Sequence, residues 1–355
     1  SVQNAANGTP ANVQKYLYRT VAYIGGTTVM KNNFNRQVLQ YFDASYGVPF
    51  SPEEAEIYAR QAVRFGAWES LIRAIGSMSV TQQNEDRWQY WLARASEQRG
   101  DSSSKRAAQD IYKKLSLSGD NYYNLLAKDH LGQKLSNLPT VEQPSSSDVQ
   151  RLNQDIHFRR AFTLRNINAP ANYTNREWNW AVRQAYLKHD DGLLLAAAKR
   201  ANDMGWYDRA IYAAERTEKK HNYTYRYITP HQTMVVSHSR NAGIDPAWAY
   251  GLMRQESRFV TAARSHVGAG GLMQIMPDTA KHVARQMGET YNPAALSDAN
   301  TNIRYGTYYL SMIQGQLSNN PVLATAGYNA GPNRAKRWQP DNQSLAADQY
   351  TESIP

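Results

Sequence analysis

The 355-residue sequence contains no cysteine and no apolar segment of 18 or more residues. The first absence excludes disulfides and thiol chemistry, and the second predicts no membrane-spanning helix. Residues 1–6 lack the charged and hydrophobic regions of a secretion signal, so we expect that any such signal has been removed. An oxidising compartment suits a chain without cysteine, although the absence does not establish one.

The sequence also lacks the patterns of metal and phosphate sites. His266 and His282 are not spaced as metal ligands, and no histidine–carboxylate cluster occurs. Gly268, Gly270 and Gly271 have neither the preceding strand nor the lysine of a phosphate-binding loop. We therefore expect no metal and no cofactor.

Positive charge is in excess, with 40 lysines and arginines against 30 acidic residues and a net charge of +10. An anionic partner is one explanation, and solubility alone is another. The basic residues are scattered and no nucleic-acid-binding motif occurs, so we predict no nucleic-acid partner.

Apolar residues recur at helical spacing through most of the chain, which predicts a mainly all-α protein. Helices are expected over 52–65, 68–75 and 88–99, ending near Gly66, Gly76 and Gly100. Their loose helix–turn–helix repetition predicts a helical solenoid. Further helices are expected over 178–187, 193–204 and 206–218, with a break at Gly205.

The best candidate linker is the stretch 138–148, which has two prolines and a serine run. We therefore predict three domains: a superhelical domain over 1–139, a helical linker domain over 140–220 and a C-terminal domain over 221–355. An irregular stretch through 227–230 is expected near the start of the third.

Glu256 is the most informative residue of the C-terminal domain. Asp245 and Pro246 form a helix start, and Ala249, Leu252 and Glu256 then share one face at helical spacing. A carboxylate that continues an apolar stripe is desolvated, which raises its pKa toward the range of a general acid. The alternative is a surface glutamate bonded to a neighbouring arginine, Arg254 or Arg258.

Two glycine-punctuated segments follow Glu256 in the sequence. Residues 265–271 are too rich in glycine for a helix and predict a tight loop, followed by Leu-Met-Gln-Ile-Met-Pro and by Asp278 or Thr279 as a helix cap. Residues 326–332 predict a second turn, which presents Tyr328 beside Asn329.

Together these segments resemble the soluble lytic transglycosylases, lysozyme-like enzymes that cleave peptidoglycan glycan strands. The matching residues are Glu256-Ser257, Ser265, the run 271–277 and the run 328–332, while Gly327 departs from the alanine usual in the family. The resemblance implies a superhelical domain, a small linker domain and a lysozyme-like catalytic domain. Peptidoglycan carries carboxylates and would suit a basic chain.

The resemblance also implies a mechanism with one carboxylate. Glu256 would protonate the leaving oxygen of the MurNAc–GlcNAc bond and then accept the proton of the muramyl 6-hydroxyl, with help from the N-acetyl group, giving a 1,6-anhydro product. Cleavage by two carboxylates is the usual alternative. Asp278 is better explained as a cap, and we expect Glu289 and Asp298 to be solvated.

Substrate-binding roles are carried over by motif position. Ser265 is expected to bond the carboxylate or a sugar, with a turn-capping role as its alternative. Gln274 and Asn329 offer amides for N-acetyl and hydroxyl groups, Met276 an apolar wall and Tyr328 a sugar contact. Met273 is a core candidate, as are the tyrosines of the helical pattern 305–309. Glu352 matches a family position at the glycan or peptide site.

The resemblance further implies residence in the periplasm of a Gram-negative bacterium, with peripheral association with the outer membrane and contacts with other cell-wall enzymes left open. We expect a C-terminally truncated chain with a shortened superhelix, because family members continue past the position of Pro355. Two alternatives stay open. One is a lysozyme-type hydrolase that uses water, and the other is a scaffold whose catalytic domain is weakly active.

Overall fold

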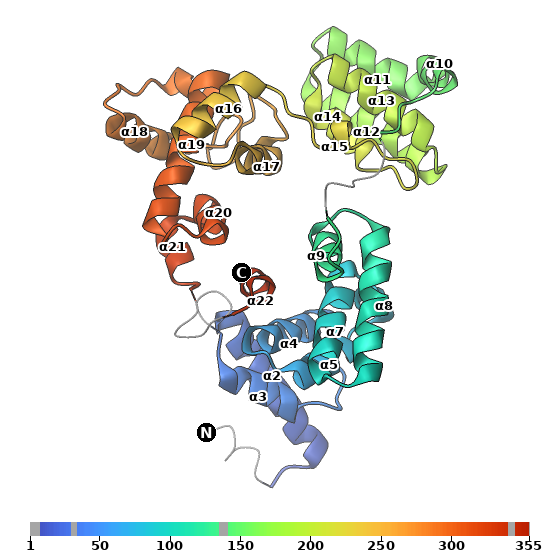
Figure 1. Cartoon of the computed structure of the whole chain (residues 1–355), viewed down its shortest axis with the longest axis vertical. Coiled ribbons are helices and arrows are strands. Elements are labelled where there is room, and N and C mark those ends of the chain that lie inside the picture. The colour runs from blue at the N-terminus through green and yellow to red at the C-terminus, as the bar shows by residue number, and fades with distance from the viewer. Residues whose placement is uncertain (1–7, 30–33, 135–140, 340–344, 355) are drawn as a thin grey trace. The chain divides into compact units, whose positions relative to one another are not determined.

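The computed structural model describes residues 8–29, 34–134, 141–339 and 345–354. These residues form an all-α protein (Figure 1), which confirms the predicted fold class. No strand occurs in the described ranges, where β-type pairing is limited to isolated bridges such as Gly270 with Ile275. None of the described helices is long and apolar enough to cross a bilayer. The chain divides into two compact units, residues 1–137 with 329–355, and residues 138–328.

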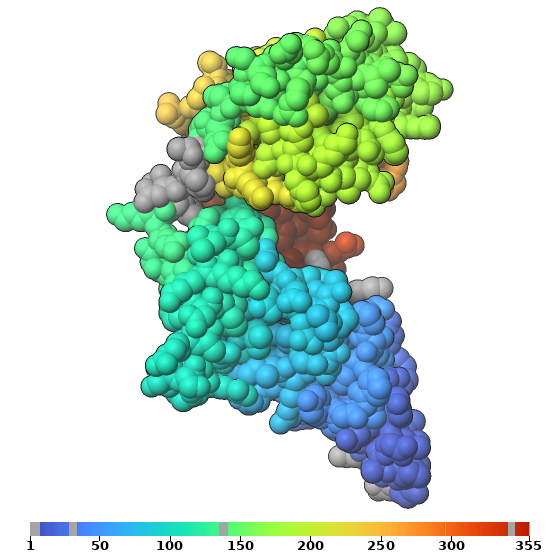
Figure 2. Space-filling model, turned by 90° about the vertical axis from the view of Figure 1, so that its right-hand side faces the viewer, coloured from blue at the N-terminus to red at the C-terminus, as the bar shows by residue number. Residues whose placement is uncertain are grey.

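The first unit is a succession of helices that pack on their neighbours in the sequence. Its helices are α2 (Ala11–Val29), α3 (Arg36–Ala44), α4 (Pro52–Phe65), α5 (Trp68–Gly76), α6 (Val80–Gln83), α7 (Asp86–Arg99), α8 (Ser102–Ser118), α9 (Tyr122–His130), α21 (Pro332–Lys336) and α22 (Ala347–Glu352). Helix α2 packs on α3, α4 on α5, α7 on α8, and α8 on α9. The space-filling view shows this order on the surface, where the colour passes from blue to teal from helix to helix (Figure 2).

The N-terminal helices begin and end largely where the sequence predicts. Helix α4 starts with a capping box, in which Ser51 and Glu54 bond each other's backbone N–H groups, and it ends at left-handed Gly66. Helix α7 likewise ends at left-handed Gly100. The sequence predicts that Gly76 caps α5, but Gly76 is the last helical residue and Ser77 takes the cap position. These ends bring Trp88, Trp91 and other apolar side chains into one buried core.

The second unit begins with a block of helices packed around Trp178. This block contains α10 (Ser146–Gln154), α11 (Ile156–Asn166), α12 (Ala171–Leu187), α13 (Asp191–Asp203), α14 (Tyr207–Ala214) and α15 (Tyr223–Arg226). Trp178 is fully buried, with Phe158, Phe162 and Trp206 within 5.6 Å between ring centroids. Edge-on aromatic contacts of this kind stabilise a core beyond the area that they bury.

The serine run predicted as part of a linker is instead a helix start. Ser145 accepts the N–H of Asp148 and caps α10, so of the described residues of the predicted linker only 141–145 lie outside a helix. The domain boundary predicted at residue 139 lies outside the described residues. The boundary at 220 stays a prediction, as do the three domains.

The rest of the second unit carries the motif segments. It contains α16 (Gln232–Asn241), α17 (Pro246–Ser257), α18 (Pro277–Gln286), the 3₁₀ helix η2 (Pro293–Ser297), α19 (Ala299–Gln316) and most of α20 (Pro321–Ala330). Helix α19 packs on α16, α18 and η2. Its buried residues include Ile303, Leu310 and Ile313, and the motif loop approaches this helix closely, because a Cβ atom at Gly306 would lie 2.3 Å from the Met273 sulfur.

Candidate active site

Helix α17 positions Glu256. Its cap, Asp245, accepts the N–H of Ala247 at 2.8 Å, and Pro246 is the first helical residue, as the sequence predicts. Ala249 and Leu252 are buried on the face that Glu256 continues. The helix ends after Ser257, where Arg258 is left-handed with φ of 48°. Glu256 therefore lies in the last helical turn, fixed by a cap at one end and a sharp reversal at the other.

The Glu256 carboxyl is half-buried and has no charged partner among the residues that the structure describes. Burial raises its pKa, as predicted. The neighbouring arginines are the alternative partners, but Arg254 and Arg258 bind the two oxygens of Glu215 at 2.7 and 3.1 Å. Within the described residues, no hydrogen bond or ion pair reaches the Glu256 carboxyl. Its position at a helix C-terminus further disfavours the charged form, because the helix dipole is negative there.

The glycine-rich segment after Glu256 is a tight loop, as predicted. Ser265 accepts the N–H of Ala269 through its hydroxyl at 2.9 Å, and its own N–H bonds the carbonyl of Ala269. These contacts correspond to the turn-capping alternative for Ser265. Gly271 has φ of 79°, and a Cβ atom there would lie 2.1 Å from the amide of Asn302 and 2.3 Å from the Leu296 carbonyl. Only glycine fits this position without displacing its neighbours.

Side chains from α17 and α19 hold the backbone of this loop. The Ser257 hydroxyl donates to the Leu272 carbonyl at 2.7 Å, which ties the loop to the residue after Glu256. The buried amide of Asn302 accepts the N–H of Met273 at 2.8 Å and donates to the carbonyls of Gly270 and Leu296, each at 3.0 Å. A buried amide with all these bonds satisfied fixes one loop conformation.

Within the loop, Gln274 and Met276 have different surroundings. Gln274 has φ of 45°, and its Nε2 donates to the carbonyls of Ala263 at 3.1 Å and Gly271 at 2.8 Å. Its amide nitrogen thus braces the loop, while its Oε1 makes no hydrogen bond within the described residues. Met273 is fully buried, as expected of a core residue, whereas Met276 is 40% exposed. Of the two methionines, Met276 is the one available to a ligand.

Tyr328 contacts the loop from α20. Its hydroxyl donates to the Met273 carbonyl at 2.8 Å, and its ring lies 5.4 Å from that of Tyr309. Desolvation and the negative charge of Glu256 raise the pKa of Tyr328, which places the two side chains within electrostatic reach. Helix α20 is also tied to α17, because Trp248 Nε1 donates to the Thr325 hydroxyl at 2.9 Å.

The turn predicted over residues 326–332 begins later than expected. Residues 326–330 are the last turn of α20, and the chain reverses at Gly331, with φ of 90°. Asn329 is therefore an exposed helical residue. Gly327 is buried inside the helix, so it serves close packing and not a turn.

The other acidic residues near the motifs have structural roles. Asp278 lies in the first turn of α18, where a negative charge is favourable, and Met276 takes the N-cap position that the sequence predicts for Asp278 or Thr279. Glu289, predicted to be solvated, instead binds Arg304 and Tyr305, and the hydrogen bond from Arg304 lowers its pKa. Asp298 caps α19 through Thr301, which lowers its pKa too. All three lack the features of a nucleophile poised beside Glu256.

Glu352 belongs to the first unit, where its carboxylate is enclosed. One oxygen is bound by the Arg87 guanidinium, and the other accepts Trp91 Nε1 at 2.9 Å and the Tyr123 hydroxyl at 2.8 Å. The Arg60 guanidinium also binds the Glu352 carbonyl at 3.1 Å. With its side chain 4% exposed, Glu352 connects α22 to α4, α7 and α9. These contacts favour a structural role over a substrate contact.

Sequence reasoning misses two residues near the site. Asn302 holds the motif loop through its side-chain amide. The sequence signal that could have found it is a polar side chain at a core position of a helix, with Asp298 one turn before it and Gly306 one turn after it. Tyr309 falls among the predicted core tyrosines, but it packs on Tyr328. Its contact depends on α20, which the sequence does not place beside α19.

Comparisons with known proteins agree with these features. Residues 234–351 match the transglycosylase SLT domain family. A soluble lytic murein transglycosylase from Salmonella typhimurium is 28% identical over 300 residues, covering 83% of this chain and 45% of that protein. The chain thus spans about half the length of the curated relatives it matches.

Solved structures resemble the chain over nearly its whole length. An inactive Glu-to-Gln variant of the lytic transglycosylase Slt from Pseudomonas aeruginosa is 30% identical, with a TM-score of 0.80 over 96% of this chain and 54% of that one. The 70 kDa soluble lytic transglycosylase from Escherichia coli is 25% identical, with a TM-score of 0.75 over 96% of this chain and 53% of that one. Over residues 234–351 the chain thus matches the transglycosylase SLT domain family, and in sequence and fold it is similar to soluble lytic transglycosylases over nearly its whole length.

Proposed function

We propose that this protein is a peptidoglycan lytic transglycosylase, which cleaves the β-1,4 bond between MurNAc and GlcNAc without consuming water. The observation that carries the proposal is the state of Glu256, a half-buried carboxyl with a raised pKa and no charged partner in the described residues. A carboxyl with a raised pKa keeps its proton to a higher pH than an ordinary glutamic acid does, which suits it to donate a proton to a leaving oxygen.

In the proposed reaction Glu256 acts twice. Its carboxyl first protonates the glycosidic oxygen as the bond to the muramyl anomeric carbon breaks, with the muramyl N-acetyl oxygen stabilising the positive charge on that carbon. The resulting Glu256 carboxylate then accepts the proton of the muramyl 6-hydroxyl, whose oxygen bonds the anomeric carbon. The product is a 1,6-anhydro sugar, and Glu256 returns to its neutral form.

Residues of the motif segments support this chemistry in distinct ways. We assign sugar contacts to Gln274 through its unbonded Oε1, to Met276 through its exposed thioether and to Asn329 through its exposed amide. Tyr328 holds the loop and retains lone pairs on its hydroxyl oxygen, which accept hydrogen bonds from a sugar. Ser265 supports the loop backbone, and we assign it no sugar contact.

A hydrolase of the lysozyme type is the nearest alternative. That reaction ordinarily uses a second carboxylate, and Asp278, Glu289 and Asp298 are engaged elsewhere. The scaffold alternative requires a degenerate site, whereas hydrogen bonds from Ser257, Asn302 and Tyr328 hold the loop beside Glu256. Transfer to the internal 6-hydroxyl is therefore the reaction we favour.

The proposed substrate also indicates the compartment in which the protein acts and gives a reason for its positive charge. Peptidoglycan lies in the periplasm of Gram-negative bacteria, so we propose that the protein acts there. Its net charge of +10 suits a polymer with carboxylate-bearing stem peptides.

Digestion of purified peptidoglycan sacculi tests the proposal. The soluble products are analysed by mass spectrometry, with the Glu256→Gln protein as control. We expect muropeptides with 1,6-anhydro ends, lighter by one water than hydrolytic products, from the wild type only. Reducing-end products would identify a hydrolase instead. A Glu256→Gln protein that cuts at the wild-type rate would exclude Glu256 as the acid.

A further inference from the structure

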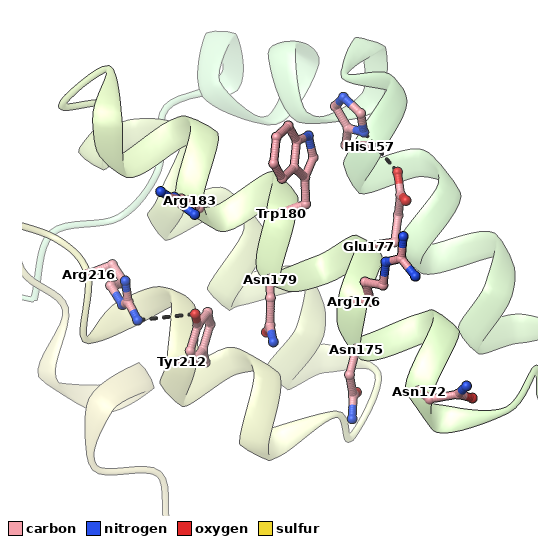
Figure 3. A pocket seen from close by; sticks show the side chains of 10 residues that line it. All are labelled: His157, Asn172, Asn175, Arg176, Glu177, Asn179, Trp180, Arg183, Tyr212 and Arg216. Atoms are coloured by element: carbon pink, nitrogen blue, oxygen red, sulfur yellow. Dashed lines mark hydrogen bonds and ion pairs between the residues drawn. The ribbon is translucent and has the colours of Figure 1, made fainter.

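A groove on the helical block around Trp178 has the features of a second ligand site. It has a volume of about 850 Å³ and is lined by α11, α12, α14 and Arg216. Figure 3 shows its side chains, which come mainly from α12. The lining residues are His157, Asn172, Asn175, Arg176, Glu177, Asn179, Trp180, Arg183, Tyr212 and Arg216. We call this the α12 groove, and its volume lies within the range of ligand sites.

Helix α12 places two kinds of residue on opposite faces. Trp178 and its buried neighbours Ala181, Val182 and Ala185 face the core. Residues at helical spacing on the other side, among them Arg176, Asn179 and Arg183, line the groove. The helix is anchored by its buried face, so the groove side chains project from a rigid support.

Trp180 is the apolar surface of the groove. Its side chain is 49% exposed, whereas Trp178 two residues earlier is fully buried. It is fixed at one edge by His157, with ring centroids 6.3 Å apart at 67°, and Glu177 accepts from His157 Nδ1 at 2.8 Å. An indole held in this way offers an open face to the C–H side of a sugar ring, a contact that also removes its apolar area from water.

Two arginines of the groove have no polar partner within the described residues. Arg176 and Arg183 are exposed, and neither forms an ion pair or hydrogen bond within the described residues. Asn179 accepts from Arg209 at 2.7 Å through its Oδ1, and its amide N–H groups make no hydrogen bond within the described residues. Arg216 stacks on Tyr212 at 4.6 Å, so it is held at the groove edge. Guanidinium groups without partners bind carboxylates in a bidentate manner.

We propose that the α12 groove is a second peptidoglycan-binding site, in which Trp180 stacks on a sugar ring and Arg176 and Arg183 bind stem-peptide carboxylates. This proposal rests on the proposed function, which supplies a ligand that combines sugar rings with carboxylates. Nucleic acid is the competing occupant. The asparagine amides and the single carboxylate of Glu177 fit a hydroxyl-rich ligand better than a polyanion.

Binding is measured with the full chain carrying Glu256→Gln, so that strands are bound without being cut. The probes are glycan strands with stem peptides, the same strands after enzymatic removal of the peptides, and a single-stranded DNA oligonucleotide. Groove variants are Trp180→Ala and the pair Arg176→Glu with Arg183→Glu. Tyr173→Ala and the pair Arg159→Glu with Lys188→Glu are the matched controls, because these exposed residues of the same block do not line the groove.

We expect Trp180→Ala to weaken binding of both glycan probes about tenfold, which corresponds to about 1.4 kcal/mol. The arginine pair should weaken only the peptide-bearing strands to a similar extent. Trp180→Tyr, which keeps an aromatic face, should restore much of the affinity. The proposal is overturned if the groove variants bind glycan like their controls, or if the arginine pair reduces DNA binding as much as glycan binding.

A second measurement separates this proposal from the proposed activity. With Glu256 intact, groove variants should keep the wild-type kcat on a short tetrasaccharide and show a raised KM only on long strands, because only these reach both sites. If the wild type releases no 1,6-anhydro products while groove-dependent binding persists, the proposed activity is wrong and the proposed glycan site in the α12 groove is supported. If those products are released but the groove variants bind glycan normally, the activity stands and the groove is not a glycan site.

Discussion

The hydroxyl of Tyr328 donates a hydrogen bond of 2.8 Å to the carbonyl oxygen of Met273. This bond joins α20 to the loop that carries Gln274 and Met276. It also brings a phenol within electrostatic reach of Glu256, whose charge contributes to the raised pKa of Tyr328. One side chain thus positions the loop and belongs to the surroundings of the proposed acid.

Tyr328→Phe should damage both stability and activity. The Met273 carbonyl would lose this partner, at a cost of about 1–3 kcal/mol in the free energy of unfolding. Displacement of the loop should lower kcat by about tenfold to a hundredfold, because small shifts of positioning groups carry large rate penalties. Denaturant unfolding and product release from sacculi measure the two effects.

Tyr309→Phe is the matched control for this prediction. Tyr309 packs on Tyr328 at 5.4 Å, but its hydroxyl makes no hydrogen bond within the described residues. Its loss should change stability by no more than about 0.5 kcal/mol. Equal behaviour of the two variants would show that the bond to Met273 does not matter.

The raised pKa of Glu256 makes a prediction for the pH dependence of activity. The protonated carboxyl is the proposed acid, so the rate should fall as the pH rises through this raised pKa. In a pH profile of kcat/KM, the descending limb should lie above the usual range of a glutamic acid. A descending limb at or below that range would assign the acid to another group.

The same shift has a consequence for stability. Because burial raises the pKa of Glu256 in the folded state, the folded protein binds the proton more tightly than the unfolded chain does. Stability from this group is complete below its unfolded pKa and is lost as the pH rises through the folded pKa. Glu256→Gln does not titrate, so its stability relative to the wild type should increase over that interval and then level off. Thermal unfolding of both proteins from about pH 4 to pH 8 measures the difference.

Local signals predict α17 well, and distant contacts account for what the sequence leaves out. The cap at Asp245 and the apolar stripe that leads to Glu256 are encoded within this one helix and its cap. Asn302 acquires its role from backbone groups at 270, 273 and 296, which lie up to 32 positions away. The spacing of apolar residues along the sequence does not predict such contacts.

At the C-terminal motif, too, contacts that are distant in the sequence decide the surroundings of each residue. Gly327 resembles a turn signal in the sequence, but burial inside α20 explains a small residue equally well. The sequence motif alone predicts that Glu352 contacts the substrate. Its partners Arg87, Trp91 and Tyr123 lie more than 220 positions earlier in the chain, where no local pattern connects them to it.

Loss of the Glu352 carboxylate should destabilise the first unit strongly. Glu352→Ala would leave Arg87, Trp91 and Tyr123 with unsatisfied groups, and breaking such a buried pair costs about 3–5 kcal/mol. Glu56→Ala is the matched control, because Glu56 binds the same arginine at 2.8 Å but is 40% exposed. It should cost about 1 kcal/mol or less. If denaturant unfolding shows equal losses of stability for Glu352→Ala and Glu56→Ala, the burial of Glu352 makes no additional contribution to stability.

Alanine substitutions at Gly271 and Gly268 distinguish the effect of close packing from the effect of backbone strain. Both have positive φ, 79° and 95°, so an alanine at either is strained by about 1 kcal/mol. Only at Gly271 would the new Cβ also meet the Asn302 amide and the Leu296 carbonyl, whereas nothing lies within 4 Å at Gly268.

We therefore expect Gly268→Ala to cost about 1 kcal/mol in the free energy of unfolding. Gly271→Ala should cost about 2–4 kcal/mol, since the added methyl overpacks a rigid site in addition to the backbone strain. It should also lower kcat on sacculi more than Gly268→Ala does, because Asn302 would be pushed from the loop that carries Gln274. Similar losses in the two variants would assign the whole effect to backbone conformation and leave the Asn302 contact without a role in placing the loop.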